Sequence, residues 1–193
     1  MRHVLVSAVA VAVLLLTACV QEPPAAEPSE SAPAPSPSST SDATPPAQTS
    51  TPEPTVYPGV DVACDSLISA QVMYDYNSNY NLIGEIAPDA GSLAASVTER
   101  NGKTCRWINA SSNLTIDLAV ARIPEPALTT LQNETLESSN PVPTYGVEGY
   151  FALDGAIGQA QAFAGEYWLV LESPYFAEPG DAAPLMKAVV ESL

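Results

Sequence analysis

Carboxylates are the main residues of this chain that could take part in chemistry, because histidine and cysteine are scarce. Histidine occurs once, as His3, and the cysteines are Cys19, Cys64 and Cys105. A Ser-His-Asp or Cys-His arrangement needs an imidazole as general base, and histidine-ligated zinc needs one as a ligand. Since His3 lies in an apolar leader, the sequence predicts that the mature chain uses neither these chemistries nor a histidine pH switch.

A hydrolase without histidine would need a pair of carboxylates at a fixed spacing across a cleft. No spacing in the sequence sets such a pair, and acidic side chains are mostly solvent-exposed. We therefore interpret the acids on predicted strands as solvated and expect no enzyme activity. A histidine-free envelope hydrolase remains the alternative function. The acids in question are Asp117, Glu148, Glu166 and Glu172.

An Asn-rich segment, residues 75–81, begins like a calcium-binding loop, with oxygen-bearing side chains at alternate positions. Such a loop needs Gly at its sixth position and Glu at its twelfth, where this chain has Tyr80 and Ile86. We therefore predict no metal site and no cofactor. Its tyrosines could instead stack on sugar rings while its amides bond to hydroxyls, although tyrosines at helical spacing also pack into cores. The candidate ligand surface is Tyr74, Tyr76, Asn77, Asn79 and Tyr80.

The first 18 residues are organised as a secretion signal. Arg2 precedes an apolar run, Val4–Leu16, and small residues follow it. The run has 13 residues, fewer than the roughly 20 of a membrane-spanning helix. The residues Leu16-Thr17-Ala18-Cys19 resemble the bacterial lipobox, in which the cysteine receives a diacylglyceryl group and becomes the mature N-terminus. The resemblance implies that residues 1–18 are removed and that lipid on Cys19 holds the chain at the outer face of the cell membrane.

After the leader the composition changes to Pro, Ser, Thr and Ala. Of the 19 prolines, 10 lie between Pro23 and Pro54. Such a segment buries too little apolar surface to offset its conformational entropy, and proline favours extended geometry. The sequence therefore predicts a disordered tether over residues 19–57, followed by a globular domain over residues 58–193.

The formal net charge is −16, and the acidic residues are spread along the chain. A chain without a basic stripe has no means of releasing counterions from nucleic acid, so we predict no nucleic-acid partner. The expected function is a non-catalytic binding or accessory role in the cell envelope. The candidate partners are the membrane, through the lipid on Cys19, and a cell-wall glycan, a lipid or an envelope protein.

Outside the membrane, two cysteines within one small domain usually form a disulfide. Cys64 and Cys105 are far apart in sequence and form no Cys-x-x-Cys motif, which makes a redox or metal pair the weaker alternative. We predict that they pair and that the first helix is joined in this way to the strand of Cys105.

Hydrophobic periodicity predicts a helix over residues 66–77, capped by Asp65. Residues 93–109 indicate a hairpin around Asn101-Gly102, with the strand register left open. Residues 114–121 alternate as a half-buried strand with one wet face.

Further elements follow in the second half of the domain. Leu128, Leu131 and Leu136 suggest a short helix after Pro126, and Asp154-Gly155 indicates a second hairpin turn. The return strand, residues 156–164, is rich in small residues, and residues 167–171 indicate a central strand. Asp181 should cap a last helix whose core-facing residues are Leu185, Met186, Val189, Val190 and Leu193. The predicted fold is a two-layer α+β domain with a mainly antiparallel sheet of about five strands and helices on one face.

Two cysteine motifs carry a resemblance to a known group of proteins. Cys64-Asp65-Ser66-Leu67 opens a helix and Cys105-Arg106-Trp107 lies on a strand, which resembles a family of secreted actinobacterial lipoproteins of unknown function. Its members share a lipobox, a Pro/Ser/Thr/Ala tether and a closing amphipathic helix, and the resemblance covers roughly residues 60–193. It supports the fold and the disulfide and implies no catalytic residues.

Overall fold

The computed structural model describes residues 54–193. The predicted signal peptide, Cys19 and the tether up to residue 53 lie outside the described residues. Within residues 54–193, no helix is both long and apolar enough to cross a membrane.

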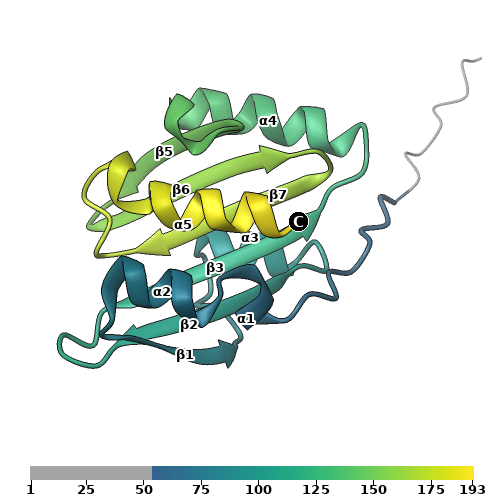
Figure 1. Ribbon diagram of the computed structural model, residues 1–193. Helices are drawn as coiled ribbons and strands as arrows, with labels where there is room; N and C mark the ends of the chain where they lie inside the picture. Colours follow the sequence, from purple (N-terminus) through teal and green to yellow (C-terminus); the bar gives the residue numbers. More distant parts are fainter. Residues whose placement is uncertain (1–53) are drawn as a thin grey trace, which may run out of the picture. The chain divides into compact units, whose positions relative to one another are not determined.

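One open antiparallel sheet of seven strands forms the centre of the domain, in the order β1-β2-β3-β7-β6-β5-β4 (Figure 1). The α+β class and the antiparallel sheet are confirmed, but the expected strand number was too low because β1 and β4 were not predicted. Its strands are β1 (Tyr80–Glu85), β2 (Lys103–Asn109), β3 (Thr115–Arg122), β4 (Asn140–Pro141), β5 (Glu148–Asp154), β6 (Ile157–Ala164) and β7 (Tyr167–Ser173).

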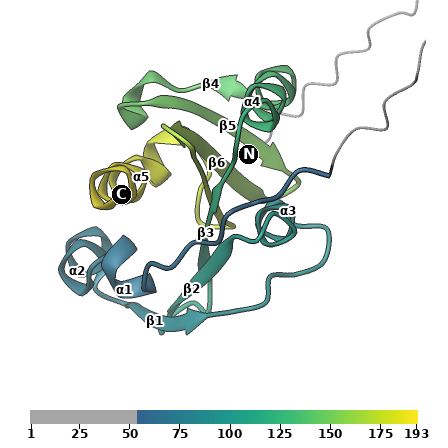
Figure 2. The same cartoon turned by 90° about the vertical axis from the view of Figure 1, so that its right-hand side faces the viewer.

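Helices cover both faces of the sheet, so the prediction of helices on one face was wrong. Figure 2 shows α1, α2 and α5 on one side and α3 and α4 on the other. The described helices are α1 (Cys64–Leu67), α2 (Ala70–Asn77), α3 (Leu93–Thr98), α4 (Ala127–Ser138) and α5 (Pro179–Ser192), with a short 3-10 turn, η1 (Pro143–Tyr145).

The central strands are apolar on both faces, which requires a layer of helices on each side. In β3, Leu118 faces the first core, under α1, α2 and α5, whereas Ala119 faces the second core, under α3 and α4. The expectation that β3 has a wet face was therefore wrong. In β7, Leu171 faces the first core and Val170 the second, and this strand is central, as predicted.

The predicted first helix is two helices. Asp65 makes no cap, and the chain turns extended at Ile68 and Ser69 before α2 begins. The Ser69 hydroxyl then accepts a hydrogen bond from the amide of Val72 at 3.3 Å. This side-chain cap replaces one of the backbone bonds that a helix N-terminus lacks, and it gives α2 a start of its own.

Residues 93–98 form helix α3, so the hairpin predicted around Asn101-Gly102 was wrong. The Ser92 hydroxyl caps α3 by accepting from the amide of Ala95 at 3.1 Å. Asn101 has φ 57°, and the amide of Gly102 donates to the carbonyl of Val97 at 3.1 Å. A left-handed residue ends helices as readily as it turns hairpins, so the Asn-Gly pair marks a helix end here.

The second half of the domain follows its sequence pattern more closely. β5 and β6 form the predicted hairpin, with Asp154 opposite Ile157 and a turn at Gly155, where φ is 58°. α4 follows Pro126 as expected. α5 begins at Pro179, two residues before Asp181, which belongs to a capping box with Glu178. Leu193 is 37% exposed and does not join the core.

Candidate binding site

Four polar side chains form one row across four neighbouring strands, and we call them the polar row. Arg106 of β2 lies opposite Asp117 of β3, Asp117 lies opposite Glu172 of β7, and Glu172 lies opposite Gln159 of β6. They lie on the face of the second core, because Val170, two residues before Glu172, belongs to it. The row crosses the sheet where β3 and β6 begin and β7 ends.

Arg106 and Asp117 form a two-pronged ion pair. The Arg106 Nε and Nη2 atoms donate to the two carboxylate oxygens of Asp117, each at 2.6 Å. The hydrogen bonds with Asp117 raise the pKa of Arg106, although partial burial opposes this. Arg106 Nη2 also lies 3.6 Å from a carboxylate oxygen of Asp89, whose side chain is 90% exposed. Asp117 is 9% exposed, so the guanidinium supplies the hydrogen bonds that water would otherwise give.

Glu172 is held by donors from two other elements. Its Oε1 accepts from the amide of Leu93 at 3.1 Å and from Gln159 Nε2 at 2.9 Å, and its Oε2 accepts from the amide of Ala94 at 2.7 Å. Two adjacent carboxylates on neighbouring strands repel each other. Here each has separate donors, Arg106 for Asp117 and the start of α3 for Glu172, and both remain buried.

A cavity of about 320 Å³ lies between the polar row, the loop before α3 and the β5–β6 turn. Four carboxylates and one guanidinium line it. Within residues 54–193, the carboxylate of Asp154 accepts no hydrogen bond, and Asp89 has only its long contact with Arg106. The cavity therefore combines fixed charges at its base with exposed acceptors at its rim. It is lined by Asp89, Ala90, Gly91, Ser92, Arg106, Thr115, Asp117, Asp154, Ile157, Gln159, Glu172, Ser173 and Pro174.

The tyrosines of the predicted ligand surface do not share one exposed face. Tyr74 is 65% exposed, whereas Tyr80 is 6% exposed. The rings of Tyr76 and Tyr80 pack together and against Tyr175, with ring centres 6.2–6.4 Å apart. Burial raises the pKa of Tyr76 and of Tyr80. Two of the three predicted rings therefore pack into the domain, which is the alternative that the helical spacing had left open.

The two asparagines of the predicted ligand surface, Asn77 and Asn79, shape the turn between α2 and β1. Asn77 Oδ1 accepts from the amide of Asn79 at 3.0 Å. This contact is a local Asx turn, which explains the Asn-rich sequence without a ligand.

The four candidate acids divide into two pairs. Glu148 and Glu166 are exposed, as the solvated interpretation requires. For Asp117 and Glu172 that interpretation was wrong, because Arg106 and the amides of α3 replace water as their donors. The sequence could not bring these two together, since their proximity depends on the pairing of β3 with β7.

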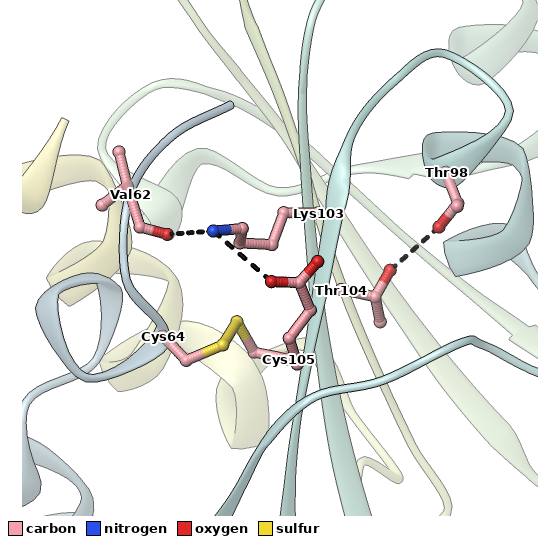
Figure 3. Close-up of a disulfide and its surroundings, with 7 residues drawn as sticks. Val62, Cys64, Thr98, Lys103, Thr104 and Cys105 are labelled. Atoms are coloured by element: carbon pink, nitrogen blue, oxygen red, sulfur yellow. Dashed lines mark hydrogen bonds and ion pairs between the residues drawn. A yellow bond between two sulfur atoms is a disulfide. The ribbon is translucent and has the colours of Figure 1, made fainter. Parts of the chain in front are cut away.

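Cys64 and Cys105 form the predicted disulfide, with Cα atoms 5.7 Å apart (Figure 3). It joins α1 to β2, as expected. Among the described residues, no group of three or more His, Cys, Asp or Glu side chains is arranged to hold a metal ion.

Comparison with models of protein families, with curated proteins and with solved structures finds no match for this chain. Functional inference therefore depends on the chemistry of the cavity and on the sequence.

Proposed function

We propose that this chain is an exported, lipid-anchored protein whose domain binds a small polar component of the cell envelope without catalysis. The leader and the lipobox-like Leu16-Thr17-Ala18-Cys19 support the location. The observation that carries the binding role is the cavity above the polar row. Its base lies on central strands of the sheet, so its polar groups are held in place before any ligand arrives.

The balance of charges in the cavity favours a ligand that donates hydrogen bonds. Arg106 pairs closely with Asp117 and more distantly, at 3.6 Å, with Asp89, so one cation faces four carboxylates. The rim acids, Asp89 and Asp154, are left as acceptors for hydroxyl or ammonium groups. The volume of about 320 Å³ lies at the lower end of the roughly 300–1,000 Å³ of small-molecule sites. Sugar units that carry free amino groups combine these properties, so we propose an amino-sugar unit of a wall glycan as the ligand.

A hydrolase that uses Asp117 and Glu172 is the second candidate, favoured by their adjacency. Side chains directly opposite on neighbouring strands have Cβ atoms about 4.5–5.5 Å apart, which resembles the carboxylate spacing of retaining glycosidases. However, the oxygens of both carboxylates already accept hydrogen bonds from the domain itself. Neither is free to protonate a leaving group or attack a sugar, so binding is the better-supported function.

Titration of the full chain with two sugar series of equal size tests the proposal. Oligomers of glucosamine carry ammonium groups, whereas oligomers of N-acetylglucosamine do not. We expect the first series to bind more tightly, and we expect that added salt weakens this binding. In the double variant Asp89→Asn/Asp154→Asn, affinity for glucosamine oligomers should fall about tenfold or more, since it loses two charge-assisted contacts. The control, Glu137→Gln, changes an exposed carboxylate on α4 outside the cavity.

Equal affinity of wild type and the double variant would show that the cavity is not the binding site. Mass spectrometry of the sugars after incubation separates the two functions. Shortened oligomers, absent from the Glu172→Gln variant, would favour the hydrolase over the binding domain.

A further inference from the structure

The outer edge of β1 has no neighbouring strand among residues 54–193. β1 and β4 are the end strands of the sheet, and their edges differ. β4 has two residues, and one of them, Pro141, has no amide hydrogen to offer a further strand. β1 has six residues and no proline, and Figure 1 and Figure 2 show no helix beyond it. A free edge of this kind presents backbone donors and acceptors to any extended chain.

The backbone groups of Tyr80 and Leu82 point away from the sheet. On the inner side of β1, the carbonyl of Asn79 accepts from the amide of Ala110 at 2.9 Å. Bonded and non-bonded pairs alternate in an antiparallel ladder, so Asn81 bonds to β2, whereas Tyr80 and Leu82 present their amides and carbonyls outward. A bulge follows Leu82. The regular run of free backbone groups therefore covers residues 80–82.

A pocket of about 180 Å³ adjoins this run, between β1 and the segment that forms α1 and α2. Its inner residues, Ile68, Met73 and Trp107, are buried, whereas Leu82 is 42% exposed. Side chains directly opposite each other on paired strands lie on the same face. A strand paired with β1 would therefore bring the side chains opposite Tyr80 and Leu82 over this pocket, which suits an apolar one.

Charge distinguishes a second copy of this chain from a different partner at the edge. The formal net charge is −16, so two copies repel each other. Asp65 lines the pocket, is exposed and forms no ion pair within residues 54–193. At the far end of β1, the side chain of Glu85 is 65% exposed and lies 3.5 Å from Lys103. This acidic edge is complementary to a basic chain.

We propose that β1 is a docking edge for an extended, basic segment of another protein, which adds a strand to the sheet. The segment pairs antiparallel with Tyr80 and Leu82, as neighbouring strands do throughout this sheet. One apolar side chain enters the pocket, and a lysine or arginine two residues away, on the same face, meets Asp65. In such strand addition, backbone hydrogen bonds supply affinity and the pocket supplies specificity.

This inference goes beyond the proposed function and does not depend on it. Met73 and Trp107 place the pocket on the face of the first core, whereas the polar row lies on the face of the second. Sugar binding and docking at β1 can therefore succeed or fail separately.

Titration of the full chain with the labelled peptide Ser-Thr-Lys-Thr-Leu-Thr-Lys-Thr-Ser, followed by fluorescence anisotropy, tests the proposal. Threonine favours an extended chain, and the leucine and both lysines share one face. Replacing the leucine by alanine should weaken binding about tenfold or more. N-methylation of the leucine removes a donor to β1 and should also weaken binding about tenfold. N-methylation of the next threonine, whose amide points away from β1, is the matched control and should change little.

Variants of the chain test the charge at the pocket. Asp65→Asn should weaken binding of the same peptide about threefold, because an exposed ion pair contributes modestly. The control, Glu137→Gln, changes an exposed carboxylate outside the pocket and should leave the affinity unchanged.

Hydrogen exchange of single amides locates the peptide. The amides of Tyr80 and Leu82 should exchange about tenfold more slowly with saturating peptide, whereas that of Asn81 should be protected in both states. Absence of binding, or binding without protection of these two amides, would overturn the proposal. Equal affinity of the two N-methylated peptides would contradict the pairing. A dimer that forms without peptide and protects the same amides would assign the edge to a second copy and would also overturn it.

Discussion

Arg106 is the residue on which the polar row depends, because it is the one cation among the described residues that line the cavity. Its guanidinium compensates Asp117, which lies directly beside the second buried carboxylate, Glu172. Without Arg106, Asp117 would be a buried charge with no partner and a like-charged neighbour. A buried charge in that position is costly.

Replacing Arg106 by methionine should lower the free energy of unfolding by about 3 kcal/mol, because it leaves Asp117 buried and unpaired. The double variant Arg106→Met/Asp117→Asn should recover part of that loss, since it removes the unpaired charge. Urea denaturation of the three proteins measures the difference. Arg122→Met is the matched control, because Arg122 pairs with Glu166 at the exposed surface. It should cost much less than Arg106→Met, because exposed ion pairs contribute little to stability. Equal losses in the two single variants would contradict the assigned role of Arg106.

The sequence allows predictions about single residue types, but it does not show which side chains lie together in the fold. The absence of imidazole from residues 4–193 follows from a count, and the pairing of Cys64 with Cys105 was predicted from the expected location outside the membrane. The polar row follows from strand register instead: Arg106, Asp117, Gln159 and Glu172 meet only because β2, β3, β7 and β6 are neighbours. A single polar residue in an apolar strand indicates either a wet face or a buried partner, and the partner is remote in sequence.

Among the elements, α5 is held at its start by tyrosines from two other parts of the chain. Tyr76 of α2 donates its hydroxyl to the carbonyl of Asp181 at 2.9 Å, and Tyr145 of η1 donates to the carbonyl of Pro179 at 3.2 Å. Burial raises the pKa of both phenols, and the charge of Asp181 adds to this effect. An ionised phenol could not donate, so the docking of α5 requires both to be protonated.

The domain should therefore lose stability in alkali. A tyrosine in the unfolded chain ionises near pH 10, whereas Tyr76 and Tyr145 in the fold resist ionisation. Their contribution is fully present below about pH 10 and is lost as pH rises further, toward the higher pKa values of the folded state. Thermal unfolding at a series of pH values should show Tm falling above about pH 10. The fall in Tm should be shallower in Tyr76→Phe/Tyr145→Phe than in wild type. In the exposed control, Tyr74→Phe, it should be as steep as in wild type. A Tm that falls equally in all three proteins would refute this assignment.

Secondary structure could be predicted where one pattern had one physical meaning. The alternation in β5 and the turn at Gly155 indicate a hairpin, and a hairpin forms. Asn101-Gly102 was ambiguous, because the left-handed backbone that turns a hairpin also ends α3. The Ser92 cap was the available sign of a helix there. The short edge strand β1 has four exposed residues among its six, so burial alternation gives little sign of it.

At the scale of the whole domain, the disulfide joins a helix to the sheet within the first core. Cys64 begins the helices of the first core, and Cys105 lies within the sheet. The two cysteines are 41 residues apart in sequence. Closing a loop of that length restricts the unfolded chain, and on the chain-entropy estimate this stabilises the fold by about 4 kcal/mol.

Reduction of the disulfide, or the Cys64→Ala/Cys105→Ala variant, should therefore lower the free energy of unfolding by about 4 kcal/mol. Guanidinium denaturation with and without reductant measures this. The double variant should not respond to reductant, which controls for other effects of the reagent. A wild-type domain equally stable in both conditions would show that the bond adds no stability. Loss of the bond should also speed chymotrypsin cleavage after Tyr57, because the segment before Cys64 then loses its covalent attachment to β2.

We predict that the whole molecule is anchored to the membrane through Cys19 alone. Each acyl methylene that enters a membrane contributes about 0.8 kcal/mol, and two chains hold a protein stably where one is marginal. When the full chain is expressed in a bacterium that processes lipoproteins, we expect mass spectrometry to find an N-terminus at Cys19 that carries a diacylglyceryl group. The protein should separate with the membrane fraction.

Cys19→Ala should keep residues 1–18 and incorporate no labelled fatty acid, while its domain unfolds as in wild type. A mature wild-type chain with an unmodified Cys19, or one that still begins at Met1, would remove the anchor. The proposed envelope role would then lose its main support, whereas sugar binding by the cavity would stand as a separate result.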